Sequence, residues 1–284
     1  MTRTVYVNGS FVPEEAAKIS VFDRGFLFAD AVYEVTSVLD GKLVDFVGHL
    51  RRLHRSLDAL EMPAPVDDAA LLAIHRELVV RNGLTEGMVY LQVTRGAAER
   101  DFAFPADPAP SLVLFTQARA LVDTAAARDG IRVLAVPDIR WGRRDIKTVQ
   151  LLAPSLGKMA AKKAGKDDAW MVEDGLVTEG TSNNAYIVTR DGAIVTRAPS
   201  SAILRGITRA AVLRLAGEAR LRVEERAFGL DEAKAAAEAF VTAASAFVTP
   251  VVEIDGCVIG DGRPGPVTRR LREIYLDDAR RTAV

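Results

Sequence analysis

The first third of the chain alternates between short strand patterns and turn signals. The β-forming residues Thr4–Val7 and Phe11–Val12 flank an Asn-Gly pair, which predicts an opening hairpin. A second strand pair is predicted at Val32–Leu39 and Lys42–Phe46, around an Asp-Gly pair. Between these hairpins, Phe22–Asp30 is apolar yet carries charges. This segment is predicted to be a loop that either lines a site or folds onto the core.

The pattern then changes to a helical period. Leucines recur at three- and four-residue steps over Leu50–Leu60, which predicts one amphipathic helix. A second helix is predicted over Asp67–Arg81, because an Asn-Gly stop follows it. Strands at Met88–Thr94 and Ser111–Thr116 complete a first α/β unit. The Ala- and Arg-rich stretch that follows has no clear strand and no apolar stripe, so it is interpreted as a link between domains.

The second half begins with a strand at Ile131–Val136 and has Asp-Gly hairpin signals at positions 174, 191 and 255. Three helices are predicted, at Leu151–Ala164, Ile207–Ala219 and Pro266–Arg280. No Gly-x-Gly-x-x-Gly follows a strand, which argues against a dinucleotide-binding fold. The sequence therefore predicts an α+β protein with mixed or antiparallel sheets and flanking helices. Its expected parts are an N-terminal domain at 1–117, a linker at 118–130 and a C-terminal domain at 131–284.

Composition narrows the class of function. The 284 residues are 49% hydrophobic and carry a net charge of -1, so electrostatics gives no reason to expect nucleic acid or a membrane as a partner. The N-terminus lacks the apolar stretch of a signal peptide, and the chain is expected in the cytoplasm. A single cysteine, Cys257, excludes an internal disulfide, and the three histidines lack metal-binding spacing. No metal site is expected.

Two short segments carry the candidate chemistry. Lys147, in Asp-Ile-Lys-Thr, lies between a loop rich in Arg and Trp and an apolar helical run. Glu179, 32 positions later, ends a predicted hairpin strand before a segment rich in hydroxyl and amide side chains. Taken alone, each is an ordinary surface residue. Their contexts, Ile-Lys-Thr and Thr-Glu-Gly-Thr-Ser-Asn, together resemble the class IV (fold-type IV) pyridoxal-phosphate aminotransferases, and most closely the D-amino acid aminotransferase group.

The resemblance runs from about Tyr6 to Tyr275. It implies a two-domain, D-amino acid aminotransferase-like fold of type IV, pyridoxal 5'-phosphate as cofactor and a homodimer. Lys147, in the C-terminal domain, would bind the cofactor and move a proton between the substrate Cα and the cofactor C4′. Glu179 would keep the cofactor ring nitrogen protonated, and Tyr33, in Ala-Val-Tyr-Glu-Val, would orient Lys147.

The resemblance also assigns the cofactor phosphate. Arg52, in His-Leu-Arg-Arg-Leu, matches the family arginine that grips it, and a planar guanidinium suits bidentate phosphate contacts. Ile203–Arg209 matches the family's glycine turn into a helix, where free N–H groups can bind an anion. The implied contacts of this turn and of two further loops are Gly206, Ile207, Thr208, Thr181, Ser182, Asn183, Thr242 and Ala243.

The sequence departs from the group at its substrate-carboxylate motif, Arg-x-His. Here Arg100 remains, but Phe102 replaces the histidine. If Phe102 lines the substrate site with Tyr33, D-amino acids are expected to react through Arg100 but to bind less tightly. Alternatively, Phe102 packs away from the site and Arg24 or Arg143 holds the carboxylate.

These features favour transamination between a D-amino acid, such as D-alanine or D-glutamate, and a 2-oxo acid acceptor. An (R)-selective amine transaminase is the second reading, because the histidine is lost. A branched-chain aminotransferase or a 4-amino-4-deoxychorismate lyase is the third. A cofactor-free scaffold with the same fold is the non-enzymatic alternative, and a visible absorbance spectrum with added pyridoxal phosphate would separate it from the enzymes.

Overall fold

The computed structural model describes residues 2–284, and the chain forms two compact units. Unit 1 is Met1–Ala120 with Ile146–Gln150 and Arg280–Val284; unit 2 is Leu121–Asp145 with Leu151–Ala279. This division differs from the expected domains in its middle, since Ile146–Gln150, with Lys147, belongs to unit 1. This segment belongs to unit 1 because it pairs like a strand with the start of the strand at Ala31–Leu39. The stretch expected as a linker belongs mostly to unit 2 and contains a short helix.

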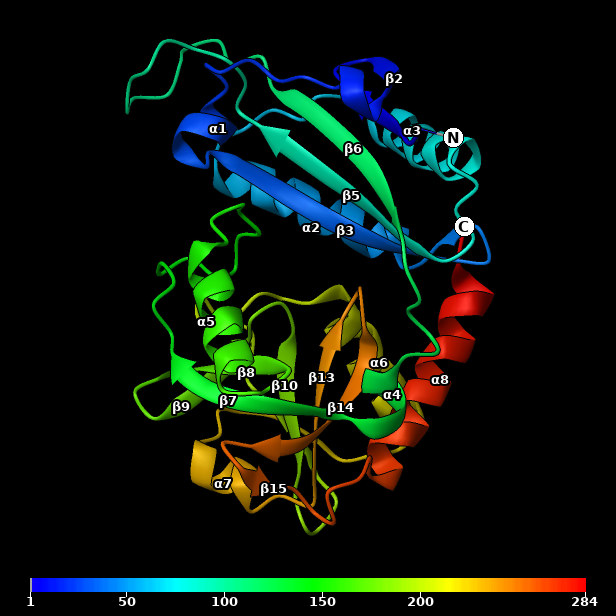
Figure 1. The fold of residues 1–284 in the computed structure, drawn as a ribbon, viewed down its shortest axis with the longest axis vertical. Helices are drawn as coiled ribbons and strands as arrows, with labels where there is room; N and C mark the ends of the chain where they lie inside the picture. Colours follow the sequence, from blue (N-terminus) through cyan, green and yellow to red (C-terminus); the bar gives the residue numbers. More distant parts are fainter. Residues whose placement is uncertain (1) are drawn as a thin grey trace. The chain divides into compact units, whose positions relative to one another are not determined.

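Unit 1 is built on a six-stranded sheet in the order β2-β1-β6-β5-β3-β4, in which every neighbouring pair is antiparallel (Figure 1). The predicted hairpins at Asn-Gly and Asp-Gly are present. The strands are β1 (Thr4–Val7), β2 (Ser10–Pro13), β3 (Ala31–Leu39), β4 (Lys42–Leu43), β5 (Gly87–Thr94) and β6 (Ser111–Ala118).

Two long helices, α2 (Phe46–Ala59) and α3 (Asp68–Arg81), cover one face of this sheet (Figure 1). The side chain of Asp67 accepts a hydrogen bond from the Ala70 N–H at 2.7 Å and caps α3. Leucines and valines of both helices form the core of unit 1 with alternate residues of β3, β5 and β6. Two short helical segments, η1 (Glu14–Ala16) and α1 (Arg24–Phe28), precede β3.

Unit 2 contains a mixed sheet of nine strands in the order β12-β11-β10-β13-β14-β7-β8-β9, with β15 beside β14. Most pairs are antiparallel, but β7 runs parallel to both β8 and β14, and β11 runs parallel to β12. The strands are β7 (Ile131–Pro137), β8 (Asp168–Glu173), β9 (Leu176–Gly180), β10 (Asn184–Val188), β11 (Ile194–Thr196), β12 (Val223–Glu225), β13 (Glu238–Ala243), β14 (Phe247–Ile254) and β15 (Cys257–Val258).

The helices of unit 2 lie along this sheet, with α5 against β7 and β8 and α6 against β12 and β13 (Figure 1). They are α4 (Ala125–Asp129), α5 (Leu152–Lys163), α6 (Ile207–Glu218), α7 (Leu230–Lys234) and α8 (Pro266–Thr282), whose last residues belong to unit 1. The predicted α+β class with mixed and antiparallel sheets is confirmed. No helix within residues 2–284 combines the length and the apolar character needed to cross a membrane.

Two local predictions need correction. The loop expected at Phe22–Asp30 contains α1, which begins after Asp23 because that side chain accepts from the Gly25 N–H at 2.8 Å. The strand expected to reach Phe46 stops at Leu43, and Phe46 starts α2.

Candidate active site

Lys147 lies in a short extended segment beside β3. The Tyr33 N–H donates to the Lys147 carbonyl at 3.0 Å, and Val32 and Thr148 form a bridge. The Lys147 N–H is 3.4 Å from Oγ of Ser56 on α2. Ile146 is buried in the core of unit 1, so the residue before the lysine anchors the segment. The lysine is thus fixed through its main chain.

The side chain of Lys147 extends over an aromatic ring. Its Nζ is 4.0 Å from the centroid of the Tyr33 ring. Among the residues of unit 1 that the structure describes, it forms no ion pair with a carboxylate. Tyr33 stacks on Tyr90, at 5.6 Å between centroids, and Tyr90 stacks on Phe115 at 4.8 Å. Burial, with the neighbouring Tyr33, raises the pKa of Tyr90 to about 12, so that hydroxyl stays protonated at neutral pH. The stack holds Tyr33 beside the lysine, in line with its predicted role.

Arg52 is buried on α2 and grips Glu34, the residue next to Tyr33. Its Nε and Nη2 donate to the two carboxylate oxygens of Glu34, each at 2.7 Å. His49 contacts the same carboxylate at 2.7 Å. Burial acts to raise the pKa of Glu34, but the charge and hydrogen bonds of Arg52 and His49 outweigh it, and the pKa lies well below its usual range. These two hydrogen bonds to Glu34 use two of the five N–H donors of Arg52. The contact of Arg52 with a phosphate stays a prediction.

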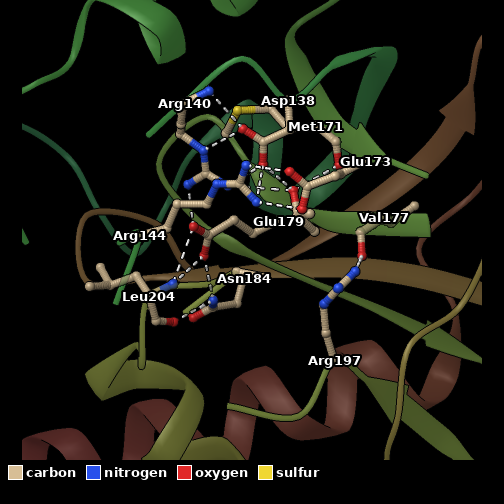
Figure 2. A network of polar contacts seen from close by, with 12 residues as sticks. Asp138, Arg140, Arg144, Met171, Glu173, Val177, Glu179, Asn184, Arg197 and Leu204 are labelled. Atoms are coloured by element: carbon tan, nitrogen blue, oxygen red, sulfur yellow. Dashed lines mark hydrogen bonds and ion pairs between the residues drawn. The ribbon is translucent and has the colours of Figure 1, made fainter. Parts of the chain in front are cut away.

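Glu179 is buried near the end of β9, in unit 2. An Asp-Gly turn joins β8 to β9, with positive φ at Asp174 (52°) and Gly175 (76°), as the predicted hairpin requires. The carboxylate accepts from Nδ2 of Asn184 at 2.9 Å and from the Leu204 N–H at 3.1 and 3.2 Å. A guanidinium N–H of Arg140 is its third donor (Figure 2). Glu179 is therefore part of a buried polar network and is not the surface residue that its hairpin position suggests.

The start of α6 lies close to this carboxylate. Gly206 is the N-cap and provides no side-chain cap, so the first N–H groups of α6 lack a side-chain acceptor. A Cβ on Gly206 would lie 2.1 Å from Oδ1 of Asn184, so a larger residue here would displace the Asn184 side chain. Asn184 also donates to the Leu204 carbonyl at 2.9 Å and so ties this turn to Glu179. Thr208 is buried in the first turn of α6. Glycine, free amides and a hydroxyl are suitable for an anion.

Three of the remaining predicted cofactor contacts of unit 2, Thr181, Asn183 and Thr242, have side-chain partners within the protein. Oγ1 of Thr181 and Nδ2 of Asn183 donate to the two oxygens of buried Asp168, at 2.6 and 2.8 Å. Oγ1 of Thr242 is 3.1 Å from the Tyr186 hydroxyl. Ser182 is exposed between the first two, and Ala243 follows Thr242 at the end of β13. Their roles toward a cofactor stay predictions.

Arg100 and Phe102 stand together on an exposed loop of unit 1. The Arg100 guanidinium lies 5.4 Å from the Phe28 ring centroid and 5.7 Å from that of Phe102, and Phe102 is 80% exposed. Arg24 is buried, pairs with Asp30 at 2.8 Å and donates to the carbonyl of Asp101 at 2.6 Å. Its guanidinium therefore holds the loop in place, which disfavours the alternative that Arg24 binds a carboxylate.

Arg143, the other alternative, is exposed in unit 2 and pairs with Asp145 at 3.0 Å. Lys147, Tyr33, Arg52, Arg100 and Phe102 thus belong to unit 1. The carboxylate and the helix start belong to unit 2.

Comparison with known proteins identifies the family. The sequence model described as "Amino-transferase class IV" matches residues 31–254. The chain belongs to the class IV aminotransferases. It is 38% identical over 272 residues to the D-alanine aminotransferase of Staphylococcus aureus (strain N315), covering 95% of each chain. It is 37% identical over 268 residues to that of Bacillus licheniformis, covering 94% of each.

Solved structures of class IV relatives have the same fold. A branched-chain amino acid aminotransferase from T.th., solved with pyridoxamine 5'-phosphate, superposes with a TM-score of 0.89 at 30% identity, over 98% of this chain and 94% of the other. The Escherichia coli branched-chain enzyme gives a TM-score of 0.91 at 24% identity, over 98% and 95%. The predicted fold-type IV architecture is confirmed.

The sequence alone did not indicate several polar residues that surround the candidate site of this aminotransferase. Glu34 and His49 hold Arg52, and Asp138 and Arg140 surround Glu179. One signal was available, because Asp138 and Arg140 directly follow β7, where strand ends often carry functional side chains. The partner of Arg140 on β9, Glu179, lies 39 residues away, and no local pattern predicts a contact over that separation.

Proposed function

We propose that the chain transfers an amino group between a D-amino acid and a 2-oxo acid, with pyridoxal 5'-phosphate as cofactor. The observation that carries this proposal is the 38% identity to a D-alanine aminotransferase over 95% of both chains. The branched-chain enzymes among the similar structures are less identical, at 24 to 30%. D-amino acids are therefore favoured over branched-chain L-amino acids as donors.

The residues present fit this cofactor. Pyridoxal phosphate requires an amine, an acidic partner for its ring nitrogen and an anion site. Lys147 offers an amine without a carboxylate partner in its unit. Glu179 offers a buried carboxylate, and the start of α6 with Gly206 and Thr208 offers N–H groups for the phosphate. When bound, pyridoxal phosphate would supply an electron sink for the substrate Cα.

The protein then supplies proton transfer and orientation. Lys147 is the base that takes the Cα proton of the amino acid and returns it at C4′ of the cofactor. Tyr33 lies against Nζ and orients the amine. Arg52 is proposed for the phosphate, since its fork with Glu34 fixes the plane of the guanidinium. Each of these roles is proposed for this chain.

Arg100 and Phe102 are proposed to recognise the substrate. An exposed guanidinium can hold the α-carboxylate, and Phe102 presents apolar surface where the related motif has a histidine. This exchange also keeps (R)-selective amine transamination as the second candidate. An (R)-amine has no carboxylate and gains from apolar contact.

A homodimer is proposed for the assembly. Unit 1 exposes apolar rings on and around α1, with Phe22 at 52%, Phe26 at 74% and Phe102 at 80% exposure, and such patches usually mark an interface. Phe26→Asp should shift the protein toward a monomer in light scattering. A native protein that is monomeric and fully active would contradict the proposal. The cytoplasm remains the expected location.

The central test is a labelling experiment. Borohydride reduction of the protein loaded with pyridoxal phosphate, followed by peptide mapping, should give a pyridoxyl label at Lys147. Labels on Lys158, Lys162, Lys163 or Lys166 instead would show that the assignment is wrong. The amino-donor test uses D-alanine, L-leucine and (R)-1-phenylethylamine with a 2-oxo acid acceptor. D-alanine should react fastest, and a preference for L-leucine would refute the proposed substrate class.

A further inference from the structure

Arg140 lies between two buried carboxylates (Figure 2). Its Nε and Nη2 donate to the two oxygens of Asp138, at 2.9 and 2.7 Å, and its main-chain N–H donates to Asp138 at 3.1 Å. The Asp138 side chain is fully buried, and Oγ1 of Thr178 also donates to it at 2.7 Å. Nη1, the remaining nitrogen of the guanidinium, contacts Glu179. This arrangement fixes the rotamer of Arg140 and directs one N–H at the carboxylate of β9.

The contacts of Glu179 leave room for one more donor. A carboxylate has about four acceptor positions. Arg140 and Asn184 take one position each, and the Leu204 N–H is shared between both oxygens. All three donors come from unit 2 and hold the carboxylate from different sides. A fourth donor, such as a protonated ring nitrogen, would complete the set.

The charges of the network point the same way. Arg144 pairs with Glu173 at 2.6 and 2.8 Å and lies 3.5 Å from Asp138. Glu173 lies toward solvent, since its side chain is 40% exposed, so the buried carboxylates of the network are Asp138 and Glu179. Arg140 is the cationic side chain that contacts Glu179 among the described residues, and a cationic ligand group there would add balancing charge to this buried carboxylate.

Burial and Arg140 act on Glu179 in opposite directions. Burial raises the pKa of Glu179 above its usual value, and the charge and hydrogen bond of Arg140 oppose this rise without outweighing it. Burial also acts to lower the pKa of Arg140, but Asp138 and Glu179 outweigh it and keep the guanidinium charged. Without Arg140, nothing cationic that the structure describes touches this carboxylate, and the neutral acid would be favoured.

We propose that Arg140 is a positioning residue for the cofactor ring. It favours the ionised form of Glu179 against the effect of burial and orients the carboxylate, so that with the ring bound the shared proton stays on the ring nitrogen and not on the carboxylate. This inference rests on the proposed function, because it requires pyridoxal phosphate as the ligand. It adds a residue whose contact with the ring is indirect, through Glu179.

The test follows the ring-nitrogen proton directly. Wild type, Arg140→Met, Arg140→Lys and the control Arg144→Met are loaded with pyridoxal phosphate labelled with ¹⁵N in the ring. The ¹⁵N chemical shift then distinguishes the protonated from the neutral nitrogen, and cofactor affinity is measured by titration. Arg144→Met is a matched control, because it removes a buried guanidinium of the same network that does not contact Glu179.

The ring nitrogen should be protonated at neutral pH in wild type, Arg140→Lys and Arg144→Met, and neutral in Arg140→Met. Cofactor affinity should fall about tenfold to a hundredfold in Arg140→Met, since a charge-assisted contact is lost. If Arg140→Met does not fold, Arg140→Gln makes the same comparison with a neutral donor. A protonated nitrogen in the uncharged variants would overturn the inference. A wild-type protein that binds no pyridoxal phosphate would instead refute the proposed function.

Discussion

The buried pair of Glu34 and Arg52 allows a quantitative test of what stabilises unit 1. The exposed fractions of these residues are 2% and 4%, and two hydrogen bonds of 2.7 Å join them. At about 4 Å between charges and an effective dielectric constant of about 20, the Coulomb attraction is roughly 4 kcal/mol. Removing one partner strands the other charge, so Glu34→Gln or Arg52→Met alone should each lower the free energy of opening by about 3 kcal/mol.

The pairing predicts strong non-additivity. The double variant should cost about as much as either single variant, which gives a coupling energy of about 3 kcal/mol. Native-state hydrogen exchange of β3 and α2 peptides is the suitable assay, because both tryptophans, Trp141 and Trp170, belong to unit 2. The exposed pair Glu77 and Arg81 on α3, at 2.7 Å, is the control and should show coupling below about 0.5 kcal/mol. Additive effects at Glu34 and Arg52 would refute the reasoning.

Three further predictions follow from other sites. Burial lowers the pKa of His75 from 6.5 to about 4. As the pH drops through that range the unfolded chain takes up the proton first, so the free energy of unfolding falls by about 3 kcal/mol. His75→Gln should remove this pH dependence in urea titrations, whereas the loss of stability due to Glu34 begins only below pH 4.5. Arg272 donates to four main-chain carbonyls on two segments of unit 2. Arg272→Met should cost about 3 kcal/mol and speed hydrogen exchange at both segments, and unchanged exchange would contradict this. Phe102→His should shift the half-reaction toward D-alanine relative to (R)-1-phenylethylamine by about tenfold, and Arg100→Ala should abolish D-alanine reactivity; intact reactivity would show that Arg100 does not hold the carboxylate.

Local patterns in the sequence predicted most elements but not how they pair. The Asp-Gly hairpins and the helices now seen as α2, α3, α5, α6 and α8 depend on contacts close in sequence, and periodicity reports these. Helix α1 has only five residues and no apolar repeat, and its start depends on the single N-cap residue Asp23. The parallel neighbours of β7 depend on contacts across unit 2, to β8 and to the distant β14.

In the candidate site, too, residues in short motifs could be predicted from the sequence, and contacts between distant positions could not. Lys147 and Glu179 stand in recognisable short motifs, so the sequence alone indicated both. The contacts that hold Glu179 and Arg52 lie in no such motif, because Arg140 and Glu179 are 39 positions apart and Glu34 and Arg52 are 18 positions apart. Their chemistry depends on burial, which a strand or helix pattern shows only as alternation.

The return of Ile146–Gln150 to unit 1 has a consequence for how the chain can be cut and recombined. The polypeptide passes between the units at four places, after Ala120, Asp145, Gln150 and Ala279. No single cleavage therefore yields two intact units, and a fragment ending at Ala120 loses both the segment along β3 and the C-terminal residue Val284 that pairs with Leu43. A chimaera that exchanges unit 1 with a relative must exchange three separate stretches together. The five residues around Lys147 must come from the same parent as β3.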